Sequence, residues 1–361
     1  MRGFRSKPSQ SSKFSRSSLL LVFALALPLL LSACGSSSLH TPLNPQSDAG
    51  HTVDRLWWIM FGMSVVIEGL VAGVVIVALV RFRRKPGDPE PVQITGNTRL
   101  EIAWTIAPAM VLVVLLVLTL TTMVNISEPK GTTMRITATG QQWWWEFDYQ
   151  GMNIVTGNEM HIPVGENVHI DLRSKDVIHG FWVPVLNGKR DVIPGHNNQL
   201  WFRADNPGTF RGECTEFCGA EHANMNFIVV AQPRAEFDAW VKQQQAPPVS
   251  DQTGLAAEGR DLVQGAKLDA NGNLVSCIAC HMIDGTNLKA KVGPNLTHVG
   301  SRQYIAAGTV PNDTDNLIRW IHNTQDVKPD NKMVFLNSQG SPYLLDDDTV
   351  RKIVAYLQSL K

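Results

Sequence analysis

The chain is organised around the stretch Cys214-Thr215-Glu216-Phe217-Cys218-Gly219-Ala220-Glu221-His222-Ala223-Asn224-Met225, which places two thiols, an imidazole and a thioether within twelve residues. A second imidazole lies upstream, in Asp176-Val177-Ile178-His179-Gly180-Phe181-Trp182. Sulfur and imidazole ligands suit copper, zinc and iron, and they disfavour magnesium and calcium. The two stretches together therefore predict a transition-metal site.

The number of candidate ligands indicates two metal ions. Four ligands saturate one tetrahedral ion, and a mononuclear blue-copper site needs one Cys, two His and a weak axial Met. Here two Cys, two His and one Met are available, together with the backbone carbonyl of Glu216. This set predicts two metals that share both thiolates. The alternatives are a structural zinc site and a disulfide between Cys214 and Cys218, although neither needs Met225 at that offset or the distant His179.

The pattern Cys-x3-Cys-x3-His-x2-Met, with its upstream His179 stretch, resembles the dinuclear copper (CuA) site of the cytochrome c oxidase subunit II family. The resemblance extends from Val53 to about Pro233. It implies a CuA centre of two copper ions, and it implies that the Glu216 side chain contributes to a magnesium site shared with subunit I. The ligands that it implies are His179, Cys214, the Glu216 carbonyl, Cys218, His222 and Met225.

The first 33 residues have the features of a secretory signal peptide. A basic, Ser-rich start without acids precedes an apolar run from Leu19 to Leu31, which is too short to span a membrane. The ending Leu31-Ser32-Ala33-Cys34 resembles a bacterial lipobox, in which Cys34 becomes the lipidated first residue. The alternative is an ordinary signal peptide with an incidental Cys. Residues 34–52 read as a linker with too few apolar residues to fold alone.

Residues 53–128 predict a transmembrane hairpin. Two apolar segments, about 56–80 and 102–124, are each long enough to cross a bilayer. The intervening segment 81–101 is expected to be cytoplasmic, with both outer ends and all later residues on the far side of a bacterial inner membrane. Its basic residues are Arg81, Arg83, Arg84, Lys85 and Arg99.

The next domain, residues 129–233, is expected to be a cupredoxin-like Greek-key β-sandwich. Apolar residues alternate with polar ones over 134–139, 145–149 and 168–172, which is typical of half-buried strands. Such a sandwich presents distant loops at one end, which would bring His179 to the Cys214–Met225 loop. Three consecutive Trp residues, Trp143 to Trp145, are predicted to alternate between the two faces of a strand.

The resemblance gives two further residues a role. Trp143 corresponds to the family's electron-entry residue, while core packing is its alternative reading. Glu101 corresponds to a carboxylate at the entrance of a proton path into subunit I. Its alternative reading is a solvated carboxylate favoured by the start of a helix.

After a predicted linker at 234–252, residues 253–361 resemble an all-α class I cytochrome c domain. Cys277-Ile278-Ala279-Cys280-His281 is the signature for covalent haem c attachment, with His281 as the proximal ligand. A redox Cys-x-x-Cys pair is the alternative, but His281 follows directly and no thioredoxin-like context is present. The resemblance implies that the Pro294 carbonyl orients His281. It places Met333 as the distal ligand, with His298 and His322 as fallbacks.

Taken together, the domains resemble subunit II of a caa-type cytochrome c oxidase, a multidomain electron-entry subunit. The implied partners are subunits I and III, membrane lipid, and an electron donor that is a cytochrome c or a quinol:cytochrome c reductase. Oxygen reduction is expected in subunit I, with proton pumping. A formal net charge of zero argues against nucleic acid as a partner. Two alternatives stay open, a CuA-containing nitric oxide reductase subunit and a stand-alone membrane-anchored electron carrier.

Overall fold

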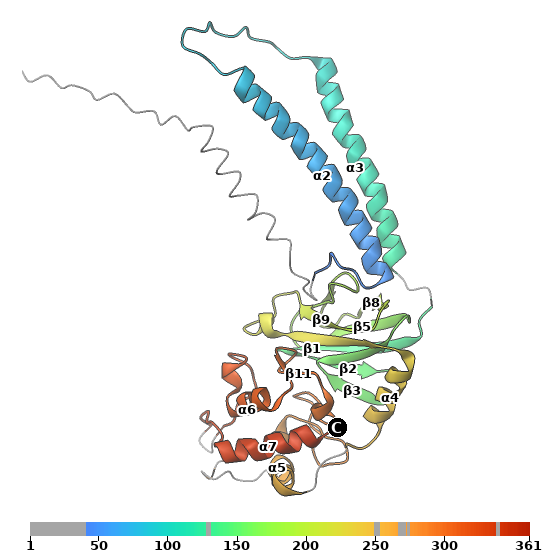
Figure 1. Cartoon of the computed structure of the whole chain (residues 1–361), viewed down its shortest axis with the longest axis vertical. Helices are drawn as coiled ribbons and strands as arrows, with labels where there is room; N and C mark the ends of the chain where they lie inside the picture. The colour runs from blue at the N-terminus through green and yellow to red at the C-terminus, as the bar shows by residue number, and fades with distance from the viewer. Residues whose placement is uncertain (1–40, 128–130, 249–252, 266–271, 273–274, 337–339) are drawn as a thin grey trace, which may run out of the picture. The chain divides into compact units, whose positions relative to one another are not determined.

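The computed structural model describes residues 41–127, 131–248, 253–265, 272, 275–336 and 340–361. The predicted signal peptide and Cys34 therefore lie outside the described residues. The described residues all fall within one structural unit of the chain. Figure 1 shows a helical hairpin, a two-sheet β domain and a helical C-terminal domain in chain order.

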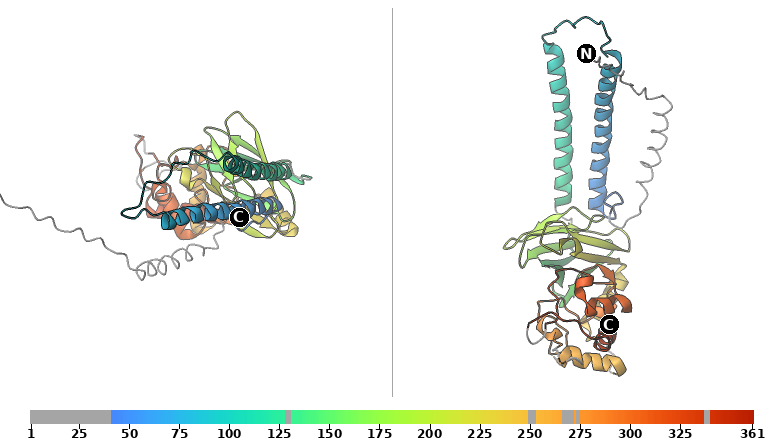
Figure 2. Two further views of the ribbon diagram at one scale, coloured as in Figure 1. Left: turned by 90° about the horizontal axis from the view of Figure 1, so that it is seen from above. Right: turned by 90° about the vertical axis from the view of Figure 1, so that its left-hand side faces the viewer.

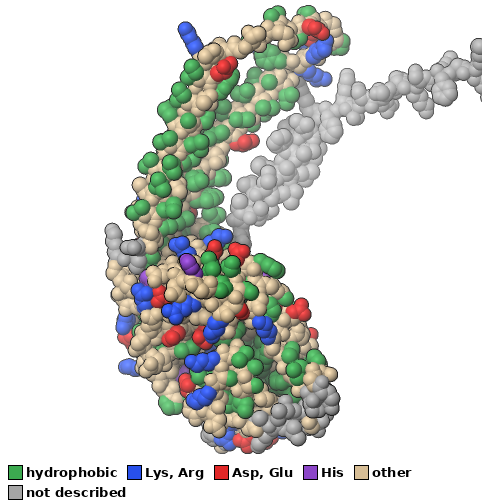
Figure 3. Space-filling view, turned by 180° about the vertical axis from the view of Figure 1, so that it is seen from behind, with side chains coloured by type: hydrophobic (Ala, Val, Ile, Leu, Met, Phe, Trp, Pro, Cys, Tyr) green, Lys and Arg blue, Asp and Glu red, His purple; other side chains and the backbone are tan. Residues whose placement is uncertain are grey.

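The hairpin consists of α2 (Asp48–Arg81) and α3 (Thr98–Ser127), which run beside each other (Figures 1 and 2). Both are long and apolar enough to cross a membrane. Hydrophobic side chains cover their outer surfaces (Figure 3). Such surfaces are stable in lipid and unfavourable in water.

Both helices begin in polar sequence, before the predicted apolar segments, and at α2 a capping residue stabilises this earlier start. Ser47 precedes α2, and its Oγ accepts a hydrogen bond from Gly50 N (2.9 Å). The end of the predicted 34–52 linker is therefore helical from Asp48 onward. The segment before α2 is attached to the β domain, since Gln46 N donates to Val185 O (2.8 Å). The end of α3 is attached there by Trp201 Nε1, which donates to Ile126 O (2.8 Å).

The β domain is a sandwich of two five-stranded sheets, which confirms the cupredoxin-like prediction. The first sheet has the order β3-β2-β1-β5-β8 and the second β4-β10-β9-β6-β7. The pairs β1/β5 and β4/β10 are parallel and the remaining pairs of these two sheets are antiparallel. The strands of the first sheet are β1 (Met134–Gln141), β2 (Trp144–Tyr149), β3 (Ile154–Gly157), β5 (Val168–Ser174) and β8 (Asn198–Phe202). Those of the second are β4 (Glu159–Pro163), β6 (His179–Trp182), β7 (Arg190–Val192), β9 (Gly208–Cys214) and β10 (Asn226–Gln232).

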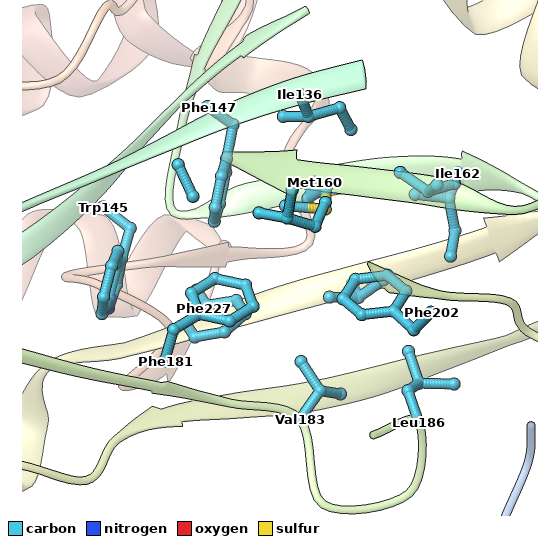
Figure 4. Close-up of a cluster of buried hydrophobic side chains, with 14 of the residues drawn as sticks. Ile136, Trp145, Phe147, Met160, Ile162, Phe181, Val183, Leu186, Phe202 and Phe227 are labelled. Carbon is cyan, nitrogen blue, oxygen red and sulfur yellow. The ribbon is translucent and has the colours of Figure 1, made fainter. Parts of the chain in front are cut away.

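The core lies between the sheets. Side chains of β2 such as Trp145 and Phe147 point toward Phe181 and Phe227 of the opposing sheet (Figure 4). The rings of Phe181 and Phe227 stack with their centroids 4.5 Å apart. Alternate residues of β2 are fully buried because successive strand side chains point to opposite faces. This core makes a rigid base for the loops at its ends.

The predicted linker at 234–252 is wrong over residues 234–245. Residues Arg234–Gln245 form α4, whose Phe237 and Trp240 are buried against the core of the sandwich. These two residues are three positions apart and so share one helix face. The tryptophan ring stacks on His161 at 4.3 Å. The glutamine run that suggested a linker is the solvent-facing end of this helix.

The C-terminal domain is built on α5 (Gly254–Gly265), α6 (Thr314–His322) and α7 (Asp347–Ser359), around one hydrophobic cluster. A small ribbon, β11 (Tyr304–Ile305) with β12 (Val310–Pro311), is an addition to the predicted all-α architecture. Helices α5 and α7 approach closely at Gly259, where a Cβ atom would lie 1.8 Å from the Lys352 carbonyl oxygen. Only glycine fits this crossing.

Candidate copper and haem centres

The sandwich brings the predicted copper ligands together from three places in the chain. His179 opens β6, Cys214 ends β9, and the remaining ligands lie in the loop that returns to β10. Within that loop, the short helix η1 (His222–Asn224) turns His222 back toward the cysteines. Because β6 and β9 are adjacent strands, with Phe181 paired to Cys214, a distant histidine reaches the loop.

The ligand atoms form a continuous cluster. The Sγ atoms of Cys214 and Cys218 are 3.7 Å apart, far longer than a disulfide bond. His179 Nδ1 lies 3.9 Å from Cys214 Sγ, and His222 Nδ1 lies 3.7 Å from Cys218 Sγ. Met225 Sδ is 3.7 Å from Cys218 Sγ, and the Glu216 carbonyl oxygen is 3.3 Å from Cys214 Sγ. One imidazole therefore faces each thiol, with the two sulfurs between them.

The electrostatics of the two thiols fit a site for cations. Cys218 and His179 lower the pKa of Cys214, whereas the closeness of Cys214 raises the pKa of Cys218 above its usual range. Two thiolates at this separation repel each other, so the first ionises easily and the second does not. Positively charged metal ions would offset the repulsion between the two thiolates, because a thiol that coordinates a metal is deprotonated. The donor set thus fits soft, thiolate-binding metals.

Asp176 supports the predicted copper ligand His179 on the side away from the cysteines. Its Oδ1 lies 2.8 Å from His179 Nε2, which leaves Nδ1 directed at Cys214. Its Oδ2 accepts a hydrogen bond from Gln142 N (2.7 Å). A carboxylate on the far nitrogen fixes both the tautomer and the ring orientation of a ligating histidine. Asp176 was not among the predicted site residues, because its contact with His179 is created by the fold.

Trp143 lies in the turn between β1 and β2 and not in a strand, so the prediction that it shares a strand face with Trp145 is wrong. Trp144 and Trp145 open β2 and point to opposite faces, as predicted for neighbours. The indole Nε1 of Trp143 donates to the Cys218 carbonyl oxygen (3.0 Å). Gln142 Nε2 donates to the same oxygen (2.8 Å). Trp143 is therefore hydrogen-bonded to the backbone of a predicted copper ligand.

In the predicted haem attachment segment, backbone contacts orient the ring of His281. Cys277 lies in the short helix η2 (Cys277–Ala279), and His281 N donates to the Cys277 carbonyl oxygen (3.0 Å). His281 Nδ1 lies 2.8 Å from the Pro294 carbonyl oxygen, which leaves Nε2 for iron. Burial lowers the pKa of His281 and so favours the neutral, ligating imidazole. A Cβ atom at Gly293 would lie 2.5 Å from His281 Cε1, so the loop packs directly against the ring.

Met333 lies in a loop that hydrogen bonds hold firmly. Thr324 Oγ1 donates to the Met333 carbonyl oxygen (2.5 Å), and Met333 N donates to Asn331 Oδ1 (2.8 Å). Its side chain packs partly against the cytochrome core. The fallback ligand His298 lines a small cavity with Glu159 and Trp240. His322, the other fallback, lies 3.8 Å from Asp347.

The structure places the two predicted acidic site residues, Glu216 and Glu101, in different surroundings. The Glu216 side chain is exposed, so only its backbone takes part in the ligand cluster. Glu101 lies in the first turn of α3, where its Oε1 accepts a hydrogen bond from Asn97 N (3.3 Å). This contact gives Glu101 a helix-capping role at the start of α3.

The fold and the ligand cluster define a membrane-anchored copper protein with a cytochrome c domain attached. Family models match at three places: cytochrome c oxidase subunit II, transmembrane domain at 44–122, its periplasmic domain at 152–232, and cytochrome c at 256–361. Cytochrome c oxidase subunit 2 of Alkalihalophilus pseudofirmus is 38% identical, over 93% of this chain and 95% of that protein. The corresponding subunit of Bacillus sp. (strain PS3) is 32% identical over the same shares. Quinol oxidase subunit 2 of Bacillus anthracis is 34% identical over 64% of this chain and 82% of that protein.

The chain belongs to the cytochrome c oxidase subunit II family. Its periplasmic-domain match implies a CuA copper centre, and its C-terminal match implies a haem c. The two apolar helices anchor the protein in a membrane, with the copper domain outside the cytoplasm. The chain is a subunit of a haem–copper oxidoreductase complex.

Proposed function

We propose that this chain is the electron-entry subunit of a proton-pumping terminal oxidase of the caa type. An electron from a cytochrome c or a quinol:cytochrome c reductase enters at the haem c held by Cys277, Cys280 and His281. It continues to the copper centre and then to the oxygen-reducing site of subunit I. The observation that supports this proposal most strongly is that one chain holds both a cluster of six candidate copper-ligand groups and a haem-attachment segment.

We propose two copper ions per chain, which would be held by the six ligand groups of the cluster. When bound, such a centre accepts and releases one electron with little change in geometry. The residues of this chain fix the ligands in advance: Asp176 orients His179, and η1 sets His222 and Met225. The Glu216 carboxylate, exposed beside the cluster, is proposed to contribute to a magnesium site shared with subunit I.

The proposed partner subunits I and III account for two exposed features. Glu68 lies exposed in the middle of α2, and a carboxylate in lipid needs a protein partner or a hydrated cavity. Three exposed apolar residues of the copper ligand loops, Val177, Ile178 and Phe217, form a surface suited to contact with another subunit. Glu101, at the start of α3, is proposed as the entrance of the proton path into subunit I.

The proposed location is a bacterial inner membrane. Removal of residues 1–33 and lipidation of Cys34 are part of the same proposal. Met333 is proposed as the distal haem ligand and Trp143 as the residue through which electrons reach the copper centre. Trp143 is suited to this role because its indole is hydrogen-bonded to the Cys218 backbone.

A nitric oxide reductase with the same copper domain is the second candidate within redox enzymes. The complex purified in mild detergent distinguishes the candidates. An oxidase brings a large multi-helix haem protein, and it consumes oxygen with reduced cytochrome c as the donor. Reduction of nitric oxide in place of oxygen would identify the reductase. Recovery of the chain without any partner would identify a stand-alone carrier.

A further inference from the structure

A lysine of the cytochrome domain is buried against the copper domain. Lys328 is 3% exposed, and its Nζ donates to the Trp143 carbonyl oxygen (2.9 Å). Burial of a lysine is costly unless its ammonium finds partners, and this burial lowers the pKa of Lys328 to about 8. The charged form is favoured by Glu221, which lies in the same loop as the predicted copper ligands. The groups that stabilise this ammonium therefore belong to the other domain.

The same loop makes a second contact with the Trp143 turn. Lys332 Nζ donates to Gln142 Oε1 (3.0 Å) and lies 5.4 Å from the centre of the Trp143 ring. A cation over an indole face is attracted by the ring quadrupole. Lys328 and Lys332 thus hold the two neighbouring residues that are both bonded to the Cys218 carbonyl oxygen.

The position of Lys328 is fixed relative to Met333. The Lys328 carbonyl oxygen accepts a hydrogen bond from Asn331 Nδ2 (2.6 Å), while Asn331 Oδ1 accepts one from Met333 N (2.8 Å). One asparagine side chain therefore joins the backbone of the docking lysine to the backbone of the proposed haem ligand. A continuous set of hydrogen bonds runs from the Met333 loop through Lys328 and Trp143 to Cys218.

The other haem-ligand loop also rests on the copper domain. Asn295 Nδ2 donates to the Val155 carbonyl oxygen (3.2 Å), beside the Pro294 that orients His281. Pro294 fits against Gly157, where a Cβ atom would lie 2.5 Å from the proline Cβ. Both loops that define the haem position thus have contacts with the sandwich.

We propose that Lys328 is a positioning residue that holds the cytochrome domain on the Trp143 turn through its hydrogen bond to the Trp143 carbonyl oxygen, so that the haem c is held at the electron-entry residue. This inference rests on the proposed function, because it assumes that electrons pass from the haem c to the copper centre. Each transfer oxidises the haem by one electron and reduces the copper centre by one.

The test uses the intact detergent-purified complex and three variants. Lys328→Met keeps most of the side-chain stem and removes the charge. Gly157→Ala inserts a methyl group under Pro294 and so acts on the other contact by a steric route. Lys291→Met is the matched control, an exposed lysine of the same domain. The two readouts are the rate of copper reduction after flash photoreduction of the haem c, and hydrogen–deuterium exchange of the peptide containing residues 142–145.

Lys328→Met is expected to slow electron transfer from the haem c to the copper centre by about tenfold or more. This is the factor by which loss of one hydrogen bond to a charged group would lower the population of the docked domain. Exchange at residues 142–145 should rise, although these belong to the other domain, and the haem and copper spectra should stay unchanged. Gly157→Ala should slow the transfer too, with faster exchange at residues 154–157, while Lys291→Met should match the wild type. A lysine needed only for folding of the cytochrome domain would not alter exchange in the copper domain.

If Lys328→Met has the same transfer rate and the same hydrogen–deuterium exchange as the wild type, Lys328 does not hold the domains together and the proposal is overturned. Faster exchange with an unchanged transfer rate would overturn its role in electron transfer. A slower rate with unchanged exchange at 142–145 would show that Lys328 acts elsewhere, and would also overturn it. Absence of haem-to-copper transfer in the wild type would instead contradict the proposed function, while the exchange measurement would still decide whether Lys328 holds the domains together.

Discussion

Asp176 and His179 are joined by a contact of 2.8 Å between Oδ1 and Nε2, on the side of the imidazole away from the copper ligands. The same carboxylate accepts the Gln142 amide, in the turn that carries Trp143. One side chain thus fixes both a metal ligand and the base of the proposed electron-entry turn. Its role is orientation, since the carboxylate points away from the two cysteines.

Replacing Asp176 with Ala should weaken copper binding about 10- to 100-fold, as expected when the carboxylate behind a ligating histidine is lost. Competition of the purified protein against a copper chelator measures this affinity. Asp148→Ala, on an exposed strand position of the same domain, is the control and should have no effect. Wild-type affinity in Asp176→Ala would mean that the protein scaffold alone orients His179.

Gly259→Val should lower the free energy of unfolding of the cytochrome domain by about 1–3 kcal/mol, the range for overpacking a close contact. The added side chain would meet the Lys352 carbonyl where α5 crosses α7. Thermal or denaturant unfolding monitored by haem absorption measures the change. Leu255→Ala, an exposed position on α5, serves as the control. An unchanged midpoint in Gly259→Val would show that the helices separate easily at this point.

The sequence predicts the centres whose candidate ligands are chemically distinctive and locally spaced. The Cys214–Met225 loop, His179 and the Cys277–His281 segment could all be recognised, and the structure brings the copper ligands together. The supporting residues were not predictable, because Asp176 and Lys328 act through contacts that only the fold creates. The glutamine run after Val241 suggested a linker, whereas Phe237 and Trp240 fix α4 on the sandwich. Trp143 was assigned to a strand because periodicity does not reveal where a turn begins.

Met333→His should keep the haem covalently attached, because Cys277 and Cys280 are unchanged, and should lower its reduction potential. Thioether ligation raises the potential of a haem relative to ligation by two imidazoles. The weak near-infrared absorption from sulfur to ferric iron should disappear. Potentiometric titration and near-infrared spectroscopy of the oxidised protein provide the measurements. If Met333→Ala keeps both the absorption and the potential, another methionine is the ligand.

Residues 81–101 should be accessible only from the cytoplasm. A single Cys placed at Gly87, in the connection between α2 and α3, reports on this, since the basic residues around it favour the cytoplasmic side. In intact cells a membrane-impermeant maleimide should leave this Cys unlabelled. A Cys at Gly188, in the copper domain, is the control that should be labelled. Labelling of the Cys at position 87 would contradict the proposed topology.

Cys218→Ser should abolish the copper centre rather than weaken it. Cys218 Sγ lies 3.7 Å from Cys214 Sγ, from His222 Nδ1 and from Met225 Sδ, so it contacts three of the other predicted ligand atoms. Loss of all intense thiolate-to-copper absorption is the expected result. Met225→Leu removes a weak ligand at the edge of the cluster and should leave a copper centre with an altered spectrum. Retention of the wild-type spectrum in Cys218→Ser would contradict a shared thiolate.

The copper content of the copper domain tests the account most directly. The fragment from Gly131 to Gln245, which keeps α4 on the sandwich, should contain two copper ions per chain after reconstitution with copper and removal of excess metal. Electron paramagnetic resonance of its oxidised form should show one unpaired electron shared between two copper nuclei. One copper per chain with the electron on a single nucleus, or one zinc bound in preference, would contradict the dinuclear centre and the electron-entry function built on it.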